Sequence, residues 1–87
     1  VFMSETTLLT IERKAEVLKR LGLSRSTLHA KVQAGLWCLP IKLGARAIGF
    51  LKHETDALIY AHMNSYTEIE IRDLVTGLIA ERVEVSP

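Results

Sequence analysis

Apolar residues recur along this chain at two spacings, one typical of helices and one typical of strands. Four stretches show the spacing of about 3.6 residues that places apolar side chains on one face of a helix. A further stretch, between the second and third of these, alternates with a period of two, as strands do. The pattern therefore predicts a mainly α fold with a small β-hairpin. The predicted helices span residues 11–21, with Thr10 as N-cap, and residues 25–34, 52–63 and 67–83.

The junction between the first two helices is specified by three small residues. Gly22 suits the position just past a helix end, because glycine enters the left-handed region at no steric cost. The hydroxyl of Ser24 can accept a hydrogen bond from the free backbone N–H of Ser26 or Thr27, which would cap the next helix. Gly35 is a helix stop of the same kind as Gly22. The stretch from Gly22 to Gly35, GLSRSTLHAKVQAG, therefore predicts a helix-turn-helix.

The second of these helices has a polar outward face. At about 100° per residue, Leu28 and Val32 point inward. The opposite side holds Ser26, Thr27, His29, Ala30 and Gln33, and none of these is acidic.

Acidic residues are also missing from a much longer stretch around this helix. A helix surface that merely faces water normally mixes both signs of charge. Between Glu16 and Glu54, thirty-seven residues contain no acid. The same stretch contains six cations, which favours nucleic-acid binding, and they are Lys19, Arg20, Arg25, Lys31, Lys42 and Arg46.

After Gly35 the pattern changes from helix to strand. Pro40 prevents a helix, Ile41–Leu43 alternates, and residues 47–50 return as a second strand after a turn at residues 44–46. We expect a β-hairpin, or wing, with Arg46 at its tip. We expect Trp37 and Phe50 to pack the hairpin onto the helices rather than to stack on bases. A short stretch before the first helix, Thr6–Leu9, could add an edge strand or extend onto the core.

The third predicted helix begins with acidic residues. Glu54 and Asp56 lie in its first turn, where the helix macrodipole favours a negative charge. Asn64-Ser65 ends the helix. Its predicted inward row consists of Thr55, Leu58, Ile59 and His62.

The fourth predicted helix is amphipathic and begins at a capping box, Thr67-x-x-Glu70. Its apolar stripe is Ile71, Leu74, Val75, Leu78 and Ile79. The stripe either covers the helix-turn-helix core or docks on a second copy to form a homodimer. We therefore expect a DNA-binding domain at residues 1–63 and a C-terminal helical extension at residues 64–87, which is part of the same domain or a dimerisation element. The tail from Val83 to Pro87 is expected to fray.

Length and charge narrow the class of protein. The chain has 87 residues, which allow one small domain. The single cysteine, Cys38, excludes an intrachain disulfide and fits a reducing cytoplasm. Neither a secretory signal nor an apolar run of the roughly twenty residues that span a bilayer is visible.

Met3 fits an initiator, so Val1 and Phe2 are assigned no role. The net charge of +1 is uneven, with +4 in residues 1–60 and −3 in residues 61–87.

Catalysis has little support in the sequence. Cys38, His29, His53 and His62 could supply a nucleophile, a base or a metal ligand, but they lack the spacing of known catalytic and metal-binding motifs. We expect no enzymatic activity, metal or cofactor. His29 and His53 are expected at the surface, and Cys38 as a small buried hydrophobe. The alternative to DNA binding is a protein–protein interaction or dimerisation module.

Three segments, taken together in this order, resemble a known family. They are Val17–Lys31 (VLKRLGLSRSTLHAK), Gly35–Phe50 (GLWCLPIKLGARAIGF) and Glu54–Leu58. The similarity covers residues 8–62 and is to the AlpA family of phage and genomic-island regulators, which is related to excisionases and to the winged helix-turn-helix of MerR proteins. The chain departs from the family at four positions. The family usually has tyrosine at the position of His29, proline at that of Cys38, and tryptophan at those of Phe50 and Leu58.

The resemblance implies a winged helix-turn-helix whose second helix enters the major groove of DNA, with the wing over the backbone or in the adjacent minor groove. Phosphates would be bound by Arg25, Lys31 and Lys42 and by the hydroxyl and helix N-terminal donors of Ser24 and Thr27, while Arg46 would reach the minor groove. Base edges would be read by Ser26, His29, Ala30 and Gln33.

The resemblance also implies partners and a role. Double-stranded DNA at an attachment site or a promoter is the expected partner, together with a tyrosine-type integrase. The protein would act as an excisionase, that is, a recombination directionality factor, or as a transcriptional regulator of a prophage or genomic island. The sequence does not distinguish the two roles, because both use the same face.

Overall fold

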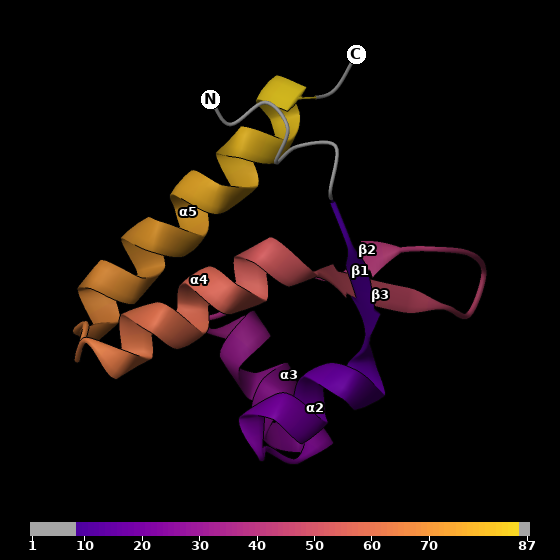
Figure 1. Cartoon of the computed structure of the whole chain (residues 1–87), viewed down its shortest axis with the longest axis horizontal. Helices are drawn as coiled ribbons and strands as arrows, with labels where there is room; N and C mark the ends of the chain where they lie inside the picture. The colour runs from indigo at the N-terminus through magenta and orange to yellow at the C-terminus, as the bar shows by residue number, and fades with distance from the viewer. Residues whose placement is uncertain (1–8, 86–87) are drawn as a thin grey trace.

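The structure is a computed structural model that describes residues 9–85, with side chains up to Arg82. Over these residues the chain is mainly helical, with a small antiparallel sheet of three strands (Figure 1), so the predicted fold class is confirmed. The elements are β1 (Ile11–Arg13), α2 (Lys14–Leu21), α3 (Arg25–Gln33), β2 (Ile41–Lys42), β3 (Ile48–Leu51), α4 (Lys52–Met63) and α5 (Glu68–Val85). The expectations for residues 1–8 and 86–87 lie outside the described residues. α5 extends to Val85, and the fraying expected from Val83 stays a prediction.

The first predicted helix is wrong at its start. Ile11–Arg13 forms β1 instead of a first helical turn, and the N-cap of α2 is Arg13 rather than Thr10. β1 pairs antiparallel with β3, and the backbone N–H of Lys52 donates to the Thr10 carbonyl at 2.8 Å. The side chains of β1 alternate exposed, buried, exposed, as a strand requires. Pairing with a distant strand thus overrides a local pattern that also suits a helix.

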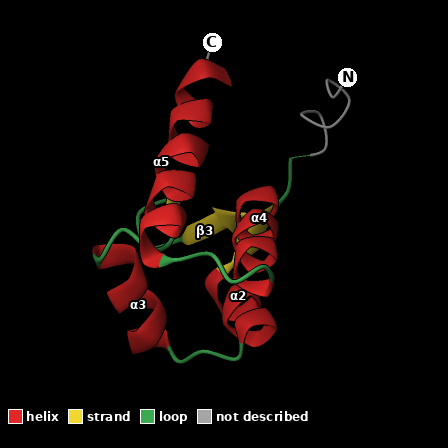
Figure 2. Cartoon of the chain, turned by 90° about the vertical axis from the view of Figure 1, so that its left-hand side faces the viewer, coloured by secondary structure: helices red, strands yellow, loops and turns green. Residues whose placement is uncertain are grey.

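The predicted helix-turn-helix is confirmed in detail. Gly22 has a φ of 68°, and its N–H donates to the Leu18 carbonyl at 2.8 Å, which closes α2. Ser24 caps α3 by accepting a hydrogen bond from the N–H of Thr27 at 3.2 Å. Gly35, with a φ of 79°, follows the end of α3. Figure 2 shows α2 and α3 below the other elements, joined by this short turn.

The wing is confirmed as an antiparallel pair of β2 and β3, and it projects away from the helices in Figure 1. The sheet order is β1-β3-β2, so the strand that the sequence analysis missed lies on the other edge of β3. Gly49 permits this close pairing, because a Cβ there would lie 2.4 Å from Cγ2 of Ile11 and 3.2 Å from the carbonyl oxygen of Glu12.

α4 begins where the sequence predicts, and α5 begins one residue later than predicted, at Glu68. α4 has the predicted bounds, and the capping box of α5 is present, with the N–H of Thr67 donating to Glu70 Oε1 at 2.8 Å and the N–H of Glu70 donating to Thr67 Oγ1 at 3.2 Å. The inward row of α4 is correct for Thr55 and Leu58, which are buried, whereas Ile59 is only half-buried, and the prediction is wrong for His62, which is exposed. The ring of His62 stacks on Trp37, with 6.2 Å between ring centroids, so it covers the core from outside.

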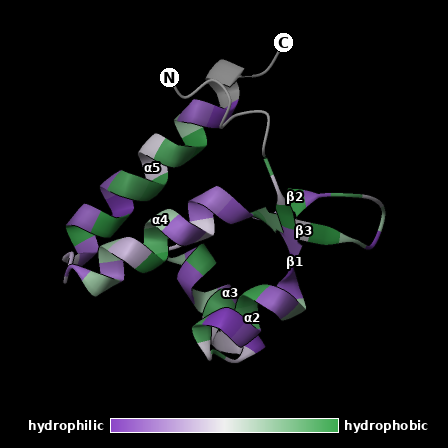
Figure 3. Ribbon diagram, viewed as in Figure 1, coloured by the Kyte–Doolittle hydropathy of each residue, from purple (hydrophilic) through white to green (hydrophobic). Residues whose placement is uncertain are grey.

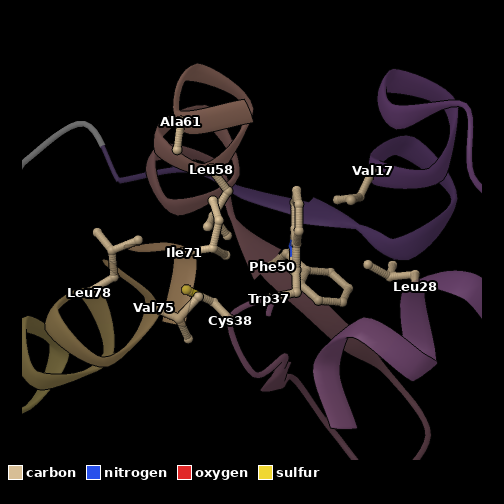
Figure 4. Packing of buried hydrophobic residues seen from close by; sticks show 10 residues of the cluster. All are labelled: Val17, Leu28, Trp37, Cys38, Phe50, Leu58, Ala61, Ile71, Val75 and Leu78. Atoms are coloured by element: carbon tan, nitrogen blue, oxygen red, sulfur yellow. The ribbon is translucent and has the colours of Figure 1, made fainter. Parts of the chain in front are cut away.

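One hydrophobic core joins α2, α3, the segment after α3, β3, α4 and α5 (Figure 4). Trp37 and Phe50 are buried, as expected, and lie close to Val17 and Leu28 of the helix-turn-helix. From α5 the core receives Ile71, Val75 and Leu78. Figure 3 shows the corresponding alternation of hydrophobic and hydrophilic residues along α5. The apolar stripe of α5 is therefore used within the same chain.

Cys38 is buried as predicted, and it makes the stability of the protein sensitive to alkaline pH. Burial, reinforced by the nearby charge of Glu54, raises the pKa of the thiol from 9.0 to about 12. Because the thiol ionises first in the unfolded chain, its contribution is complete below pH 9 and is lost as the pH rises toward 12. By about pH 10 we expect the protein to have lost about 1.4 kcal/mol of unfolding free energy relative to a Cys38→Ala variant. Urea denaturation of both proteins at pH 8 and pH 10 measures this difference, and parallel losses would contradict it.

Candidate nucleic-acid interface

Burial divides α3 into two faces. Leu28 is buried and Val32 is half-buried against the core. The opposite face is open to solvent and holds Ser26, Thr27, His29, Ala30 and Gln33. α3 contains no acidic residue, so this face can approach a polyanion without like-charge repulsion.

The N-terminus of α3 concentrates hydrogen-bond donors. The first N–H groups of a helix have no intrahelical acceptor, and the helix macrodipole adds a partial positive charge there. Ser24 and Thr27 lie at this end, with their hydroxyl oxygens 2.9 Å apart, and both residues are exposed. Arg25 is exposed beside them. This group of side chains and amides has the chemistry that binds a phosphate.

The wing supplies two further cations. Lys42 lies on β2 and is exposed. Arg46 is exposed in the loop between β2 and β3, where the N–H of Leu43 donates to the Ala47 carbonyl at 2.8 Å. Arg46 is therefore in the hairpin loop, as the sequence predicts.

Ion pairing separates the cations of the chain into two groups. Four of the eleven are paired with a carboxylate of the described residues, and they are Arg20, Lys52, Arg72 and Arg82. The other seven have no carboxylate within 4.0 Å in the part of the chain that the structure describes. They lie on β1, α2, α3 and the wing, and they are Arg13, Lys14, Lys19, Arg25, Lys31, Lys42 and Arg46.

Arg20 is an exception within the basic stretch. It donates to Glu12 Oε1 at 2.7 Å and also forms an ion pair with Asp56. The hydrogen bond to Asp56 and then that to Glu12 raise the pKa of Arg20 above its usual value. Burial alone would raise the pKa of Asp56, but its bonds to Arg20 and Lys52 lower it. Arg20 thus ties α2 to β1 and α4, and it contributes less free positive charge than the sequence suggests.

Lys31 lies at the edge of the predicted face. Its side chain is half-buried and lines a groove between the helix-turn-helix and α4, together with Leu21, Leu23 and Ile59. The other predicted contact residues are exposed, so Lys31 differs from them in its surroundings.

One buried ion pair was missed by the sequence analysis. Glu54 is only 2% exposed, and Arg82 from the far end of α5 donates to both of its oxygens, with Nε to Oε2 at 2.8 Å and Nη2 to Oε1 at 2.5 Å. Arg82 Nη2 also donates to the Leu39 carbonyl at 2.7 Å. A signal was available, because Arg82 is placed four residues after Leu78 and so falls on the apolar stripe of its helix. The pair joins α5 to α4 and does not belong to the exposed face of α3.

The histidines and the cysteine do not assemble into a site. His29 and His53 are exposed, as expected, and Cys38 is buried. Within the described residues no group of three or more histidine, cysteine, aspartate or glutamate side chains is placed to hold a metal ion.

None of the described helices is both long and apolar enough to cross a membrane.

Comparison with known proteins relates the segment from β1 to α4 to a protein family. Searches of curated proteins and of solved structures gave no match. The family model described as the prophage CP4-57 regulatory protein (AlpA) matches residues 10–63, which is more than half of the chain. This match covers every element from β1 to α4 and ends before α5. The chain therefore belongs to the AlpA family of prophage regulatory proteins, a family of regulators and not of enzymes.

Proposed function

We propose that this protein binds double-stranded DNA through the exposed face of α3 and through the wing. The observation that carries the proposal is a difference in ion pairing between two groups of cations. Those on α3 and the wing have no carboxylate partner among the described residues, whereas the cations of α4 and α5 do. Unpaired cations beside a face without acids are the electrostatic footprint of a nucleic-acid-binding protein.

The proposed DNA contacts are of two kinds. Contacts to phosphates position the protein on the duplex, and contacts to base edges recognise the sequence. Phosphates are bound by Arg25 and Lys42, by Lys31 from the edge of the face, and at the N-terminus of α3 by the hydroxyls of Ser24 and Thr27, since the N–H of Thr27 itself donates to Ser24. Arg46 enters the minor groove from the wing. Base edges in the major groove are read by Ser26, His29, Ala30 and Gln33, of which Gln33 can pair with adenine and Ala30 can touch a thymine methyl group.

Within DNA binding, we infer a role in a prophage or genomic island, in the cytoplasm, as an excisionase or as a transcriptional regulator. The membership of the AlpA regulatory family supports this role. A tyrosine-type integrase is the expected partner in the first case. Mapping the bound sites separates the two roles, because an excisionase occupies the arms of an attachment site and a regulator occupies a promoter.

We also infer that α5 completes the domain of residues 1–63 instead of forming a separate dimerisation element through its apolar stripe. The burial of Ile71, Val75 and Leu78 in the common core supports this inference. A module that bound only proteins would leave the unpaired cations of α3 and the wing unexplained.

The proposal predicts a strong dependence of DNA affinity on salt. If about five phosphates are neutralised, the logarithm of the binding constant falls with the logarithm of salt concentration at a slope of about −4 to −5. Affinity should then be about 250- to 1,000-fold lower at about 200 mM than at about 50 mM salt. Gel-shift titrations with a cognate site measure the slope. An affinity that is flat in salt would contradict binding through this surface.

Single substitutions show how much α3 and the wing each contribute to the salt dependence of DNA affinity. Arg25→Ala on α3 and Lys42→Ala on the wing should each reduce the slope by about one, since each removes one phosphate contact. Lys52→Ala is the matched control for Lys42→Ala, because Lys52 is also an exposed lysine but pairs with Asp56 on α4. The control should leave the slope unchanged. If Arg25→Ala or Lys42→Ala also left it unchanged, the docking of that element would be wrong.

A further inference from the structure

Large apolar side chains are exposed at the corner between α4 and α5. Of the eight exposed large hydrophobic residues in the described part of the chain, four come from ten consecutive positions at this corner. They are Tyr60 (64% exposed), Met63 (73%), Tyr66 (43%) and Ile69 (71%). A cluster of exposed apolar side chains marks an interaction surface more often than single exposed apolar residues do.

A groove lies beside the corner. It has a volume of about 470 Å³, and its apolar lining comes from Leu21, Leu23, Ile59 and Met63. Trp37 and the His62 ring stacked on it also line the groove. Met63 belongs both to the groove and to the exposed corner, so the two surfaces are adjacent.

The groove and the corner carry opposite charge. The groove is bordered by Arg20, which Glu12 and Asp56 neutralise, and by Lys31, which has no carboxylate partner among the described residues and gives the groove its positive charge. On the corner, Ile69 has acidic neighbours at Glu68, Glu70 and Asp73, all exposed. Glu68 lies 3.8 Å from Arg72, so Glu70 and Asp73 give the corner its net negative charge. Asp73 follows Ile69 by one helical turn and therefore lies on the same face of α5.

We propose that the protein forms a two-fold dimer in which the corner segment of each copy, residues 66–73, packs into the groove of the other copy. Two adjacent surfaces that are both apolar and of opposite charge can satisfy the requirement of a two-fold interface, in which residue i contacts j and j contacts i. Tyr66 and Ile69 supply the apolar side chains, and Asp73 faces Lys31 of the second copy. In the dimer Lys31 is therefore not available to a phosphate, and the phosphate contacts of α3 come from its N-terminus, at Ser24, Arg25 and Thr27. This dimer is distinct from one made through the apolar stripe of α5, because that stripe is buried in the core.

The dimer does not depend on DNA binding. Its consequence for DNA recognition does rest on the proposed function, since a two-fold dimer presents two α3 helices and favours a site with two inverted half-sites. The test below contains no DNA, so that its failure is distinguishable from a failure of DNA binding.

Sedimentation equilibrium of the full chain, from about 1 to about 200 µM, measures the association, because interfaces at the small end of the usual range are weak. The mass should rise from that of a monomer toward twice that value. Ile69→Asp should raise the dissociation constant at least about 10-fold, as expected for an anchor at the centre of an interface. Leu39→Asp is the matched control, because Leu39 is also exposed (51%) but belongs to the loop before β2. It should dimerise as the unchanged protein does.

A charge exchange tests the orientation. Lys31→Glu and Asp73→Lys should each weaken the dimer, and the double variant should recover it, because opposite charges again face each other. Circular dichroism of every variant should match that of the unchanged protein, since both positions lie outside the core. A monomer at all concentrations, or a dimer that Ile69→Asp does not weaken, would overturn the proposal. A double variant without recovery would overturn the pairing of Lys31 with Asp73.

Discussion

Replacing Arg82 by methionine is expected to lower the free energy of unfolding by about 3–5 kcal/mol. The loss is large because the substitution leaves the carboxylate of Glu54 buried without its partner. An ion of that size held away from water costs several kcal/mol unless it is paired and hydrogen-bonded. For a small domain with a total stability of about 5–15 kcal/mol, this loss brings the protein close to unfolding at 25 °C.

The geometry of the pair supports this magnitude. Both carboxylate oxygens of Glu54 accept hydrogen bonds from one guanidinium, at 2.8 and 2.5 Å, while the Glu54 side chain is 2% exposed. The hydrogen bond to Glu54 also raises the pKa of Arg82 above its usual value, so the charge of Arg82 persists at any ordinary pH. Methionine keeps much of the length of the arginine stem and removes the charge and the donors.

Two further variants separate a lost ion pair from lost packing. Arg72→Met is the control, because Arg72 is an exposed arginine of the same helix, 3.8 Å from Glu68 and donating through Nε to the Ala34 carbonyl at 3.1 Å. Its loss leaves no buried charge without a partner, so it should cost only about 1 kcal/mol. The double variant Glu54→Met with Arg82→Met should recover most of the loss, since removing both charges of a buried pair is often neutral. Urea unfolding followed by circular dichroism measures all three proteins. Equal costs for Arg82→Met and Arg72→Met would contradict the assignment.

The parts of the fold that depend on a few neighbouring residues were predictable from the sequence. The stop at Gly22 and the cap at Ser24 use one backbone conformation and one hydrogen bond across three residues. The capping box of Thr67 and Glu70 is equally local. Because such determinants act within one helical turn, their residue types and spacing are sufficient to place them.

The errors concern interactions between distant parts of the chain. Ile11–Arg13 alternates as a strand but also fits a helical period, and only its pairing with β3 decides between them. The partner of Glu54 is 28 residues away, and the first turn of α4 offered a nearer explanation for an acid. Periodicity reports which face a residue occupies, and it does not identify the element that covers that face.

The candidate interface shows the same division. The helical period correctly gave the exposed side of α3. It could not distinguish Arg20 from Lys19, which are neighbours in sequence and have the same charge. Glu12 and Asp56 neutralise Arg20, and these acids reach it from β1 and α4. The free charge of a basic stretch therefore depends on the tertiary structure, even where the count of cations is known.

A chain that ends at Met63 is expected not to fold, although it retains the whole segment that matches the AlpA family. The truncation removes Ile71, Val75 and Leu78 from the core. Burial of an aliphatic side chain contributes about 1.5–3 kcal/mol, so the three together contribute about 5–9 kcal/mol. This is comparable with the whole stability of a small domain, which is about 5–15 kcal/mol. The same truncation removes Arg82 and leaves Glu54 without its partner.

Circular dichroism and thermal unfolding of the truncated chain measure the outcome, with a chain ending at Arg82 as the control. The control keeps the three core side chains and the ion pair with Glu54, so it should unfold cooperatively close to the temperature of the full chain. A cooperative transition in the chain ending at Met63 would show that the family-matched region folds alone, and α5 would then be an appended element. If the chain ending at Met63 is unfolded, α5 is part of the domain that holds α3 in place. A loss of DNA binding on truncation would then reflect the loss of the fold and not the loss of a DNA contact.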